Sequence, residues 1–303
     1  MNYRNIIKSR DLRIKILSHL GWVPDGIMLR LQYWLQTGRK LDLKHPKRFT
    51  EKLQLYKMKY RNPDMLRCTD KYEVRKYIEE KGMGEYLIPL IGIFDEVNDI
   101  DFNALPQQFV AKTTDGGGGN QVLICKNKEK LSEKDFRERL DGWMSMPQQK
   151  KPSGREWAYE NNFPRRIMIE MLIGNEKMKD LPDYKFFCFN GKVHYVYGIC
   201  DRKVGVSAQF GIYDREFNKL DVDRCDELHQ EVALPKPTNY ETMVELAERL
   251  SEGFPHVRVD LYNVMGQIYF GELTFYDGSG YMKFSPDGFD FEMGEKFDVN
   301  GMI

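Results

Sequence analysis

Residues 257–280 (VRVDLYNVMGQIYFGELTFYDGSG) constrain the fold more strongly than any other part of this sequence. Apolar and polar residues alternate up to a tight turn at Met265-Gly266 and again beyond it, a pattern that predicts two antiparallel strands. Folding back at the turn brings the carboxylates of Asp260 and Glu272 together. Two neighbouring acids repel unless a proton or a cation lies between them, and hard oxygen ligands suit Mg²⁺. Considered alone, the hairpin also fits a structural ion pair to Arg258 with one exposed acid.

A glycine-rich segment far upstream favours the metal interpretation. Residues 109–120 (FVAKTTDGGGGN) predict a strand end, a loop and a second strand that continues to residue 125. Backbone N–H groups in a loop without side chains can approach an anion closely. Lys112 at the base of the loop adds a compact positive charge suited to phosphate. Considered alone, the segment also fits a flexible turn with an exposed lysine. The four loop glycines are Gly116, Gly117, Gly118 and Gly119.

Composition narrows the class of protein. The 303 residues carry 46 Lys+Arg and 46 Asp+Glu, which does not suggest a nucleic-acid binder. The charge is uneven, because residues 1–61 contain 15 basic and 4 acidic residues, a local charge of +11. The cysteines are widely spaced without a metal-binding pattern, so we expect reduced thiols and a cytoplasmic location. No apolar run approaches ~20 residues, and no secretion signal is recognised at the N-terminus.

Periodicity predicts helices first and then two mixed α and β regions, which is an α+β organisation. Residues 145–164 are polar and predict a loop or linker. The hairpin at 183–201 is expected to turn at Asn190-Gly191, a strong hairpin signal. The expected helices are 12–20, 49–60, 70–82, 132–143 and 238–250, with capping boxes at Asp70 and Thr238. The other expected strands are 88–94 and 165–173.

Taken in order, these elements resemble the ATP-grasp superfamily, and most of all its TupA-like, teichuronopeptide-biosynthesis group. The resemblance covers roughly residues 45–285. It rests on Asp70-Lys71 opening a helix, VAK before the glycine loop, IMIEMLIG, RVD and GELTFYDG, together with RFTEKLQLYKMKYRNP and DYKFFCFNGKV. It implies two α+β lobes that clamp a nucleotide, after a basic helical region. The expected divisions are 1–65, 66–164 and 165–303.

The resemblance also implies roles for single residues. Lys71, Lys112 and the loop glycines would hold the ATP phosphates, and Glu170 would meet the adenine. Asp183 would contact the ribose, with Lys185 near phosphate or adenine. Arg258, with Lys112, would act on the transferring γ-phosphoryl group. Each also has a structural alternative: an exposed lysine for Lys71, an edge-strand acid for Glu170, a strand-end acid for Asp183 and a solvated lysine for Lys185.

The metal ligands implied are Asp260, Glu272 and Thr274. The family pattern is ExNxxPG, whereas Thr274 replaces the asparagine and Asp277 the proline. A hydroxyl coordinates Mg²⁺ more weakly than an amide oxygen, so the number of metal ions stays open. Arg202, Asp277 and Ser279 are expected to contact the acceptor substrate, Arg202 by holding a carboxylate in a bidentate pair.

The implied function is an ATP-dependent carboxylate–amine ligase that uses ATP and Mg²⁺ and forms an amide through an acyl phosphate. The family setting implies an amino acid or amine joined to a uronic-acid sugar, or a sugar nucleotide, for a capsular or cell-surface polysaccharide. A kinase on the same fold and a sugar-nucleotide glycosyltransferase are the alternatives. The latter needs an acid cluster at a strand end, and 221–223 (DVD) is expected to be a loop.

The basic region suggests a recruiting surface for an anionic acceptor or for the inner membrane leaflet. Its charges alternate with aromatic residues that could stack on sugar or base, and Lys44, Lys47 and Arg48 are the cations chosen to test this hypothesis. The alternative is a helical cap over the first lobe. The aromatic residues concerned are Tyr33, Trp34, Phe49, Tyr56 and Tyr60.

Overall fold

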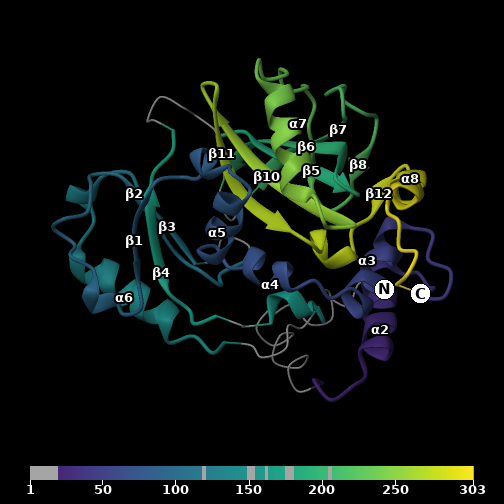
Figure 1. Cartoon of the computed structure of the whole chain (residues 1–303), viewed down its shortest axis with the longest axis horizontal. Coiled ribbons are helices and arrows are strands. Elements are labelled where there is room, and N and C mark those ends of the chain that lie inside the picture. The colour runs from purple at the N-terminus through teal and green to yellow at the C-terminus, as the bar shows by residue number, and fades with distance from the viewer. Residues whose placement is uncertain are drawn as a thin grey trace.

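Two main sheets, antiparallel except for one parallel pair at the edge of the second, organise the molecule, with helices between and around them (Figure 1). The computed structural model describes residues 20–117, 121–148, 154–160, 163–174, 181–203 and 207–302, without the side chains of 201–203 and 207. The expected α+β class is confirmed, while the expected helix at 12–20 and loop glycines Gly118 and Gly119 lie outside the described residues. No helix in the described ranges is long and apolar enough to cross a bilayer.

The first sheet has the strand order β1-β4-β2-β3. Strands β2 and β3 form the hairpin that carries the glycine loop, and β4 pairs with both β1 and β2. The expected boundary at residues 164 and 165 therefore falls before a strand that hydrogen-bonds into the first sheet. The strands are β1 (Leu90–Phe94), β2 (Phe109–Thr113), β3 (Val122–Cys125) and β4 (Ile167–Met171).

The second sheet has the order β11-β10-β5-β6-β7-β9. Its two predicted hairpins form where expected, with Asn190, Gly191, Met265 and Gly266 at positive φ in the turns. Positive φ at both central residues is what a type I′ turn requires. The strands are β5 (Asp183–Phe189), β6 (Lys192–Lys203), β7 (Ser207–Asp214), β9 (Leu228–His229), β10 (His256–Val264) and β11 (Gln267–Thr274).

Some predicted helices form with their predicted caps and others do not. Ser132 caps α6 by accepting a hydrogen bond from the Asp135 backbone N–H, as a serine at that position should. Asp70 accepts from the backbone N–H groups of Tyr72 and Glu73, one turn ahead of α5. The capping box at Thr238 is wrong, because α7 begins two residues later without a side-chain cap.

Three helices, α2, α4 and α8, and the strands β7, β9 and β12 were not predicted from the sequence. Residues 221–223 were expected in a loop, but Asp223 belongs to the short strand β8, which pairs with β12. The helices are α2 (Asp25–Thr37), α3 (Phe49–Lys59), α4 (Pro63–Thr69), α5 (Glu73–Glu80), α6 (Glu133–Met144), α7 (Tyr240–Ser251) and α8 (Gly288–Lys296). The short strands are β8 (Asp223–Arg224) and β12 (Phe284–Ser285).

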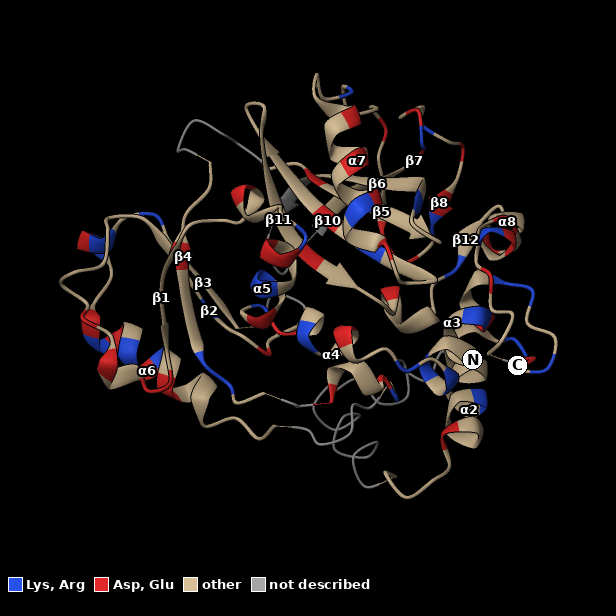
Figure 2. Cartoon of the chain, in the orientation of Figure 1, with Lys and Arg blue, Asp and Glu red and all other residues tan. Residues whose placement is uncertain are grey.

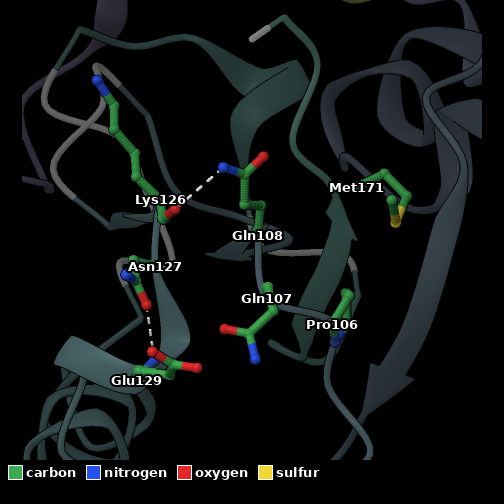
Figure 3. Close-up of a pocket in the computed structure, with 7 residues that line it drawn as sticks. All are labelled: Pro106, Gln107, Gln108, Lys126, Asn127, Glu129 and Met171. Carbon is green, nitrogen blue, oxygen red and sulfur yellow. Dashed lines mark hydrogen bonds between the residues drawn. The ribbon is translucent and has the colours of Figure 1, made fainter. Parts of the chain in front are cut away.

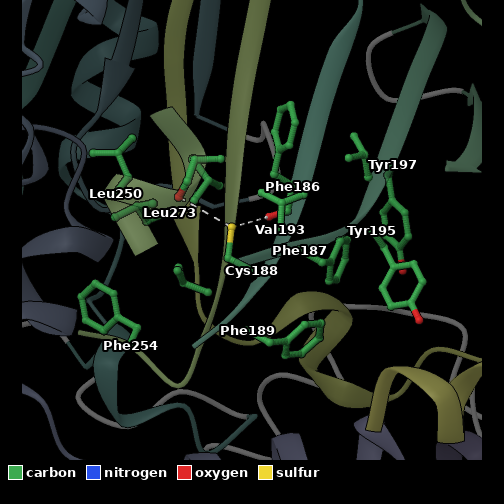
Figure 4. Close-up of a cluster of buried hydrophobic side chains, with 14 of the residues drawn as sticks. Phe186, Phe187, Cys188, Phe189, Val193, Tyr195, Tyr197, Leu250, Phe254 and Leu273 are labelled. Atoms are coloured by element: carbon green, nitrogen blue, oxygen red, sulfur yellow. Dashed lines mark hydrogen bonds between the residues drawn. The ribbon is translucent and has the colours of Figure 1, made fainter. Parts of the chain in front are cut away.

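Each sheet has its own apolar core. Helix α6 covers one face of the first sheet, where Phe136 packs on Phe109. The larger core combines the second sheet with α3, α5, α7 and α8, and Figure 4 shows part of it around Cys188. Helix α5 shares this second core through Tyr77 and Ile78 although it precedes the first sheet in the chain. It therefore lies between the two sheets (Figure 1).

Candidate functional site

One face of the second sheet is divided into an apolar half and a polar half. On its apolar half, Phe187, Phe189 and His256 contact the ring of Phe49 from α3. The polar half continues along the same strands, because side chains two residues apart share a face. It carries Asp183 and Lys185 on β5, Arg258 and Asp260 on β10, and Glu272 and Thr274 on β11. Strand alternation alone therefore brings six of the predicted site residues together.

Arg258 is the centre of this polar half. Its Nε and Nη2 donate to the two carboxylate oxygens of Asp260, each at 2.7 Å. Nη2 also donates to Glu272 at 2.9 Å and to the hydroxyl of Thr274 at 3.0 Å, while Nη1 pairs with Asp277. The guanidinium thus holds three carboxylates around one point. The ion pair foreseen as a structural alternative is present, and Asp260 and Glu272 also face each other in register.

Lys185 is a second cation inside the same cluster. Its ammonium pairs with Asp183 at 2.9 Å and with Asp260. Asp183 and Asp260 are buried, so Lys185 is not the solvated strand lysine that its sequence context also allowed. Burial by itself would lower the pKa of Lys185, but the two carboxylates raise it above its usual value. The ammonium therefore stays charged.

The pKa shifts show that two buried carboxylates of this cluster, Asp260 and Asp277, are ionised at neutral pH. Burial raises the pKa of Asp260, but Arg258 and Lys185 outweigh burial and lower it below its usual value. The pKa of Asp277 is lowered in the same way, by Arg224 and then Arg258 against burial. Four carboxylates (Asp183, Asp260, Glu272, Asp277) face three cations (Lys185, Arg224, Arg258), which leaves a net charge of 3 − 4 = −1.

The first sheet contributes a group of opposite sign. Lys112 of β2 pairs with Glu170 of β4 at 2.6 Å, across two hydrogen-bonded strands. Arg75 of α5 holds the other oxygen of Glu170 at 3.2 Å and donates to the Ile88 carbonyl at 2.9 Å. Glu170 is buried, so it is not an exposed edge-strand acid. Together with Lys71, this group has a net charge of 3 − 1 = +2.

Lys71 connects the positive group to the negative one. Its backbone N–H donates to the Thr114 carbonyl at 2.9 Å, and its ammonium donates to the carbonyl of Gly116. Burial and the nearby charge of Lys112 lower the pKa of Lys71 to about 8, while Glu272 acts in the opposite direction. Lys71 thus interacts electrostatically with Lys112 on one sheet and with Glu272 on the other. It is only partly exposed, unlike an ordinary lysine in the first turn of a surface helix.

The described part of the glycine loop is held close to Lys71. A Cβ at Gly116 would lie 2.6 Å from Thr113 Oγ1 and 2.7 Å from Gln121 Oε1, whereas one at Gly117 would meet nothing within 4 Å. The absence of a side chain at Gly116 therefore lets the loop fold onto its own hairpin. Arg165 anchors the start of the loop by pairing with Asp115 at 2.9 Å.

The three residues expected to contact the acceptor substrate lie in different environments. Asp277 is buried, with its carboxylate held by Arg224 at 3.3 Å and by Arg258. Ser279 lies in the left-handed turn after it, and its hydroxyl donates to Glu156 at 2.6 Å. Arg202 lies on β6, and its side chain is outside the described part.

Several residues of the site were not foreseen from the sequence. Arg75 pairs with Glu170, and Arg224 pairs with Asp277. The fully buried Lys57 donates from its ammonium to the backbone carbonyl of Ser279 at 2.8 Å. Lys57 also pairs with Glu156 at 3.4 Å. No motif marks these residues. For Lys57, the only signal in the sequence was a basic residue within an apolar helical stripe. For Arg224, it was a basic residue directly after the DVD string.

The donor chemistry of the polar half fits Mg²⁺. Asp260 and Glu272 present hard carboxylate oxygens in register on adjacent strands, and the Thr274 hydroxyl lies 3.1 Å from Glu272 Oε1. Among the described residues, no group of three or more His, Cys, Asp or Glu side chains is placed to hold a metal ion. Mg²⁺ commonly binds one or two carboxylates and completes its shell with water and substrate phosphates. Two carboxylates with a net negative charge match that mode.

Two surface depressions lie outside the two charged groups. One of about 440 Å³ is found at the end of the first sheet where β2 begins and β3 and β4 end (Figure 3). Its lining residues are Pro106, Gln107, Gln108, Lys126, Asn127, Glu129 and Met171. None of them belongs to the two charged groups.

In the basic N-terminal region, much of the described charge is used internally. Arg39 and Arg48 pair with Asp287 and Asp290 of α8, and Lys57 is buried. Tyr33, Phe49 and Tyr56 are buried, so these rings are not available to stack on sugar or base. Helix α3 caps the second sheet, whereas a cap over the first lobe was expected. Lys44 and Lys47 remain exposed.

Comparison with known proteins adds one strong finding. A family model described as TupA-like ATP-grasp matches residues 51–298, which is most of the chain. No curated protein matches significantly. Similar solved structures include D-alanine–D-alanine ligases from Helicobacter pylori (15% identity, TM-score 0.42) and Bacillus anthracis (17%, 0.40). The alignments cover 76% and 69% of this chain.

A further similar structure is an N5-carboxyaminoimidazole synthetase from Staphylococcus aureus complexed with ADP. It is 14% identical with a TM-score of 0.37, and the alignment covers 68% of this chain. The present chain spans 61%, 57% and 44% of these three proteins.

Proposed function

The chain belongs to the TupA-like ATP-grasp family, and we propose that it is an ATP-dependent carboxylate–amine ligase. The observation that carries this proposal is the pairing of a positive group on one sheet with a negative group on the other, with Lys71 between them. Such an arrangement is complementary to the phosphates of ATP on one side and to a divalent cation on the other. The two sheets would then be the two lobes of the clamp.

We propose that Lys71, Lys112 and the glycine loop bind the phosphates and that Glu170 lies at the adenine. Asp183 and Lys185 would contact the ribose or phosphates. Asp260 and Glu272, with Thr274, would hold Mg²⁺, which neutralises charge on the phosphates when bound. Phosphoryl transfer depends on positioning and charge neutralisation more than on covalent help from the protein.

Arg258 is suited to stabilise the transferring phosphoryl group. An oxygen of the acceptor carboxylate attacks the γ-phosphorus, the bond to the bridging oxygen breaks, and ADP leaves. The acyl phosphate is then attacked at its carbonyl carbon by an amine, which loses a proton, and inorganic phosphate departs. Closure of the glycine loop would exclude water from that intermediate.

For the acceptor, we propose a uronic-acid sugar or its nucleotide, and for the nucleophile an amino acid or other amine of a capsular or cell-surface polysaccharide. Arg202, Asp277 and Ser279 are the residues proposed to contact it. The five cysteines all lie within the described residues and form no disulfide, which fits a reducing compartment such as the cytoplasm. Cytoplasmic ATP would be the phosphoryl donor.

The test is ADP release with Mg·ATP across a panel of uronic-acid sugar nucleotides crossed with amino acids. We expect ADP and amide only where both substrates are present, and a hydroxamate when hydroxylamine replaces the amine. ADP formed with a hydroxyl acceptor would instead indicate a kinase. Thermal stabilisation by a Mg·UDP-sugar but not by Mg·ATP would contradict the ligase proposal, because selective binding stabilises the native state.

A further inference from the structure

Helix α2 exposes an apolar face that takes no part in the two charged groups of the candidate site. Ile27, Leu31 and Trp34 follow one another at helical spacing, with exposed fractions of 60%, 46% and 57%. Trp22, just before the helix, is 80% exposed. The other exposed large apolar residues in the described ranges come singly from separate elements. We call Trp22, Ile27, Leu31 and Trp34 the α2 patch.

The opposite face of α2 is fixed to the protein. Met28, Leu29 and Tyr33 are buried, and the Tyr33 hydroxyl is 2.8 Å from Thr50 Oγ1 of α3. Arg155 additionally holds Asp25 at 3.1 Å and the Leu20 carbonyl at 2.7 Å. The helix is thus anchored on one side while its apolar side faces outward. A contiguous exposed apolar face of this kind marks an interaction surface.

The charge around the α2 patch indicates what would cover it. The exposed cations on α2 and in the segment that follows it are Arg30, Lys40, Lys44 and Lys47. The acids of this region are largely neutralised, since Asp25 pairs with Arg155, and Asp287 and Asp290 pair with Arg39 and Arg48. Asp42 is exposed and accepts hydrogen bonds within its own loop. Figure 2 shows the basic residues along α2 and the loop that follows it.

The sequence before the described residues extends the same charge. Residues 1–19 contain five Lys or Arg and one acid. An apolar helical face bordered by tryptophans and surrounded by cations is the combination that binds the surface of an anionic bilayer. Tryptophan is favoured at the level of the lipid headgroups. No described helix is suited to span a bilayer, so α2 would lie on the surface.

We infer that the α2 patch docks this protein on an anionic phospholipid surface. The apolar side chains would enter the headgroup region, and the surrounding lysines and arginines would lie against lipid phosphates. A protein held there would meet acceptors that are themselves attached to lipid. This inference does not depend on the proposed ligase activity, because docking requires neither ATP nor an acceptor.

Flotation of the full chain with vesicles tests this inference. We expect binding to phosphatidylglycerol–phosphatidylcholine vesicles, weak binding to pure phosphatidylcholine, and weakening between about 0.1 M and about 1 M salt as electrostatic attraction is screened. The variant Trp22→Ser/Ile27→Gln/Leu31→Gln/Trp34→Gln should bind the anionic vesicles at least about tenfold more weakly. A control, Leu228→Gln/Val232→Ser/Met265→Gln, removes other exposed apolar side chains and should bind like the wild type.

Thermal unfolding of all three proteins should agree within a few degrees, because only exposed side chains are changed. Three results would overturn the inference: absence of wild-type binding to anionic vesicles, undiminished binding by the patch variant, or a wild-type dimer in light scattering that the patch variant abolishes in the absence of lipid. The last result would make the patch an interface between two copies of the chain.

Discussion

Lys71 lies where the charges of the two sheets meet, and its pKa of about 8 reports burial beside Lys112. A lysine kept in this environment weakens the folded protein at neutral pH, since its ammonium is better solvated in the unfolded chain. Residues of this kind occur at functional sites, where a bound anion restores the missing stabilisation. Asp260 is the opposite case, because its partners lower its pKa and keep it charged.

We predict that Lys71→Met stabilises the unliganded protein at pH 7 and weakens its binding of Mg·ATP. From about pH 8 to about pH 10.5 the unfolded state binds more protons at Lys71 than the folded state does, so this residue's penalty fades as pH rises. The gain at pH 7 has an upper limit of about 3 kcal/mol. The lost hydrogen bond to Gly116 will reduce it.

Urea denaturation at pH 7 and at about pH 9.5 measures the effect, with Lys40→Met at an exposed position as the control. The advantage of Lys71→Met over the wild type should shrink at the higher pH. A Lys71→Met variant that is less stable than the wild type at both pH values would show that Lys71 is a structural ion-pair residue.

Within single strands, alternation places apolar residues on one face and the charged residues of the site on the other. On β10, Val257, Val259 and Leu261 are buried, and α7 packs against this strand, while Arg258 and Asp260 face the other way. The β2–β3 hairpin likewise places Lys112 on one face and leads into the glycine loop, where Gly116 lies against two side chains of the same hairpin. In that loop, Thr113 Oγ1 and Gln121 Oε1 lie 3.0 Å apart and occupy the space a Cβ at Gly116 would need.

Gly116→Ala should therefore displace the loop, whereas Gly117→Ala is the matched control because its Cβ would meet nothing. We expect Gly116→Ala to weaken Mg·ATP binding at least about tenfold and to cost about 1 to 3 kcal/mol of stability. Calorimetric titration with a non-hydrolysable ATP analogue and urea denaturation measure the two effects. A wild-type affinity of Gly116→Ala for the ATP analogue would contradict the assignment of this loop to the phosphates.

At the scale of the whole molecule, the last described helix fastens the N-terminal region to the second sheet. Asp290 of α8 accepts hydrogen bonds from the backbone N–H and hydroxyl of Thr50, at 3.0 and 2.8 Å, and pairs with Arg39 and Arg48 at 3.3 and 3.4 Å. Asp287, one turn earlier, pairs with the same two arginines. Residues nearly 250 positions apart in sequence are thereby joined at a single point.

The two acids share their arginine partners, but only Asp290 also accepts hydrogen bonds from Thr50. The side chain of Asp290 is 0% exposed and that of Asp287 is 48% exposed. Asp290→Ala should lower the free energy of unfolding by about 1 to 3 kcal/mol, since it leaves the buried backbone N–H of Thr50 without its acceptor. Asp287→Ala should cost less than about 1 kcal/mol. Comparable losses in urea denaturation would mean that burial does not govern this contact.

Much of the fold was predictable because local periodicity specifies it. Alternation predicted the β10–β11 hairpin and its polar face. The Asn190-Gly191 pair predicted the turn of the β5–β6 hairpin, and Ser132 predicted the start of helix α6. Helix α2 was missed because its exposed face is as apolar as its buried one, which removes the periodic signal. The helix at 238–250 was predicted, but its cap was not, since Thr238 lies one residue ahead of the N-cap position.

The sequence by itself determined which residues share a strand face, and therefore that Arg258, Asp260, Glu272 and Thr274 lie together. Only the tertiary structure decided their partners. Arg75 reaches Glu170 across 95 residues and Arg224 reaches Asp277 across 53. Strand geometry follows from side chains two positions apart, whereas ion pairs between distant elements depend on how whole sheets and helices pack. That packing placed Lys71 between the two charged groups.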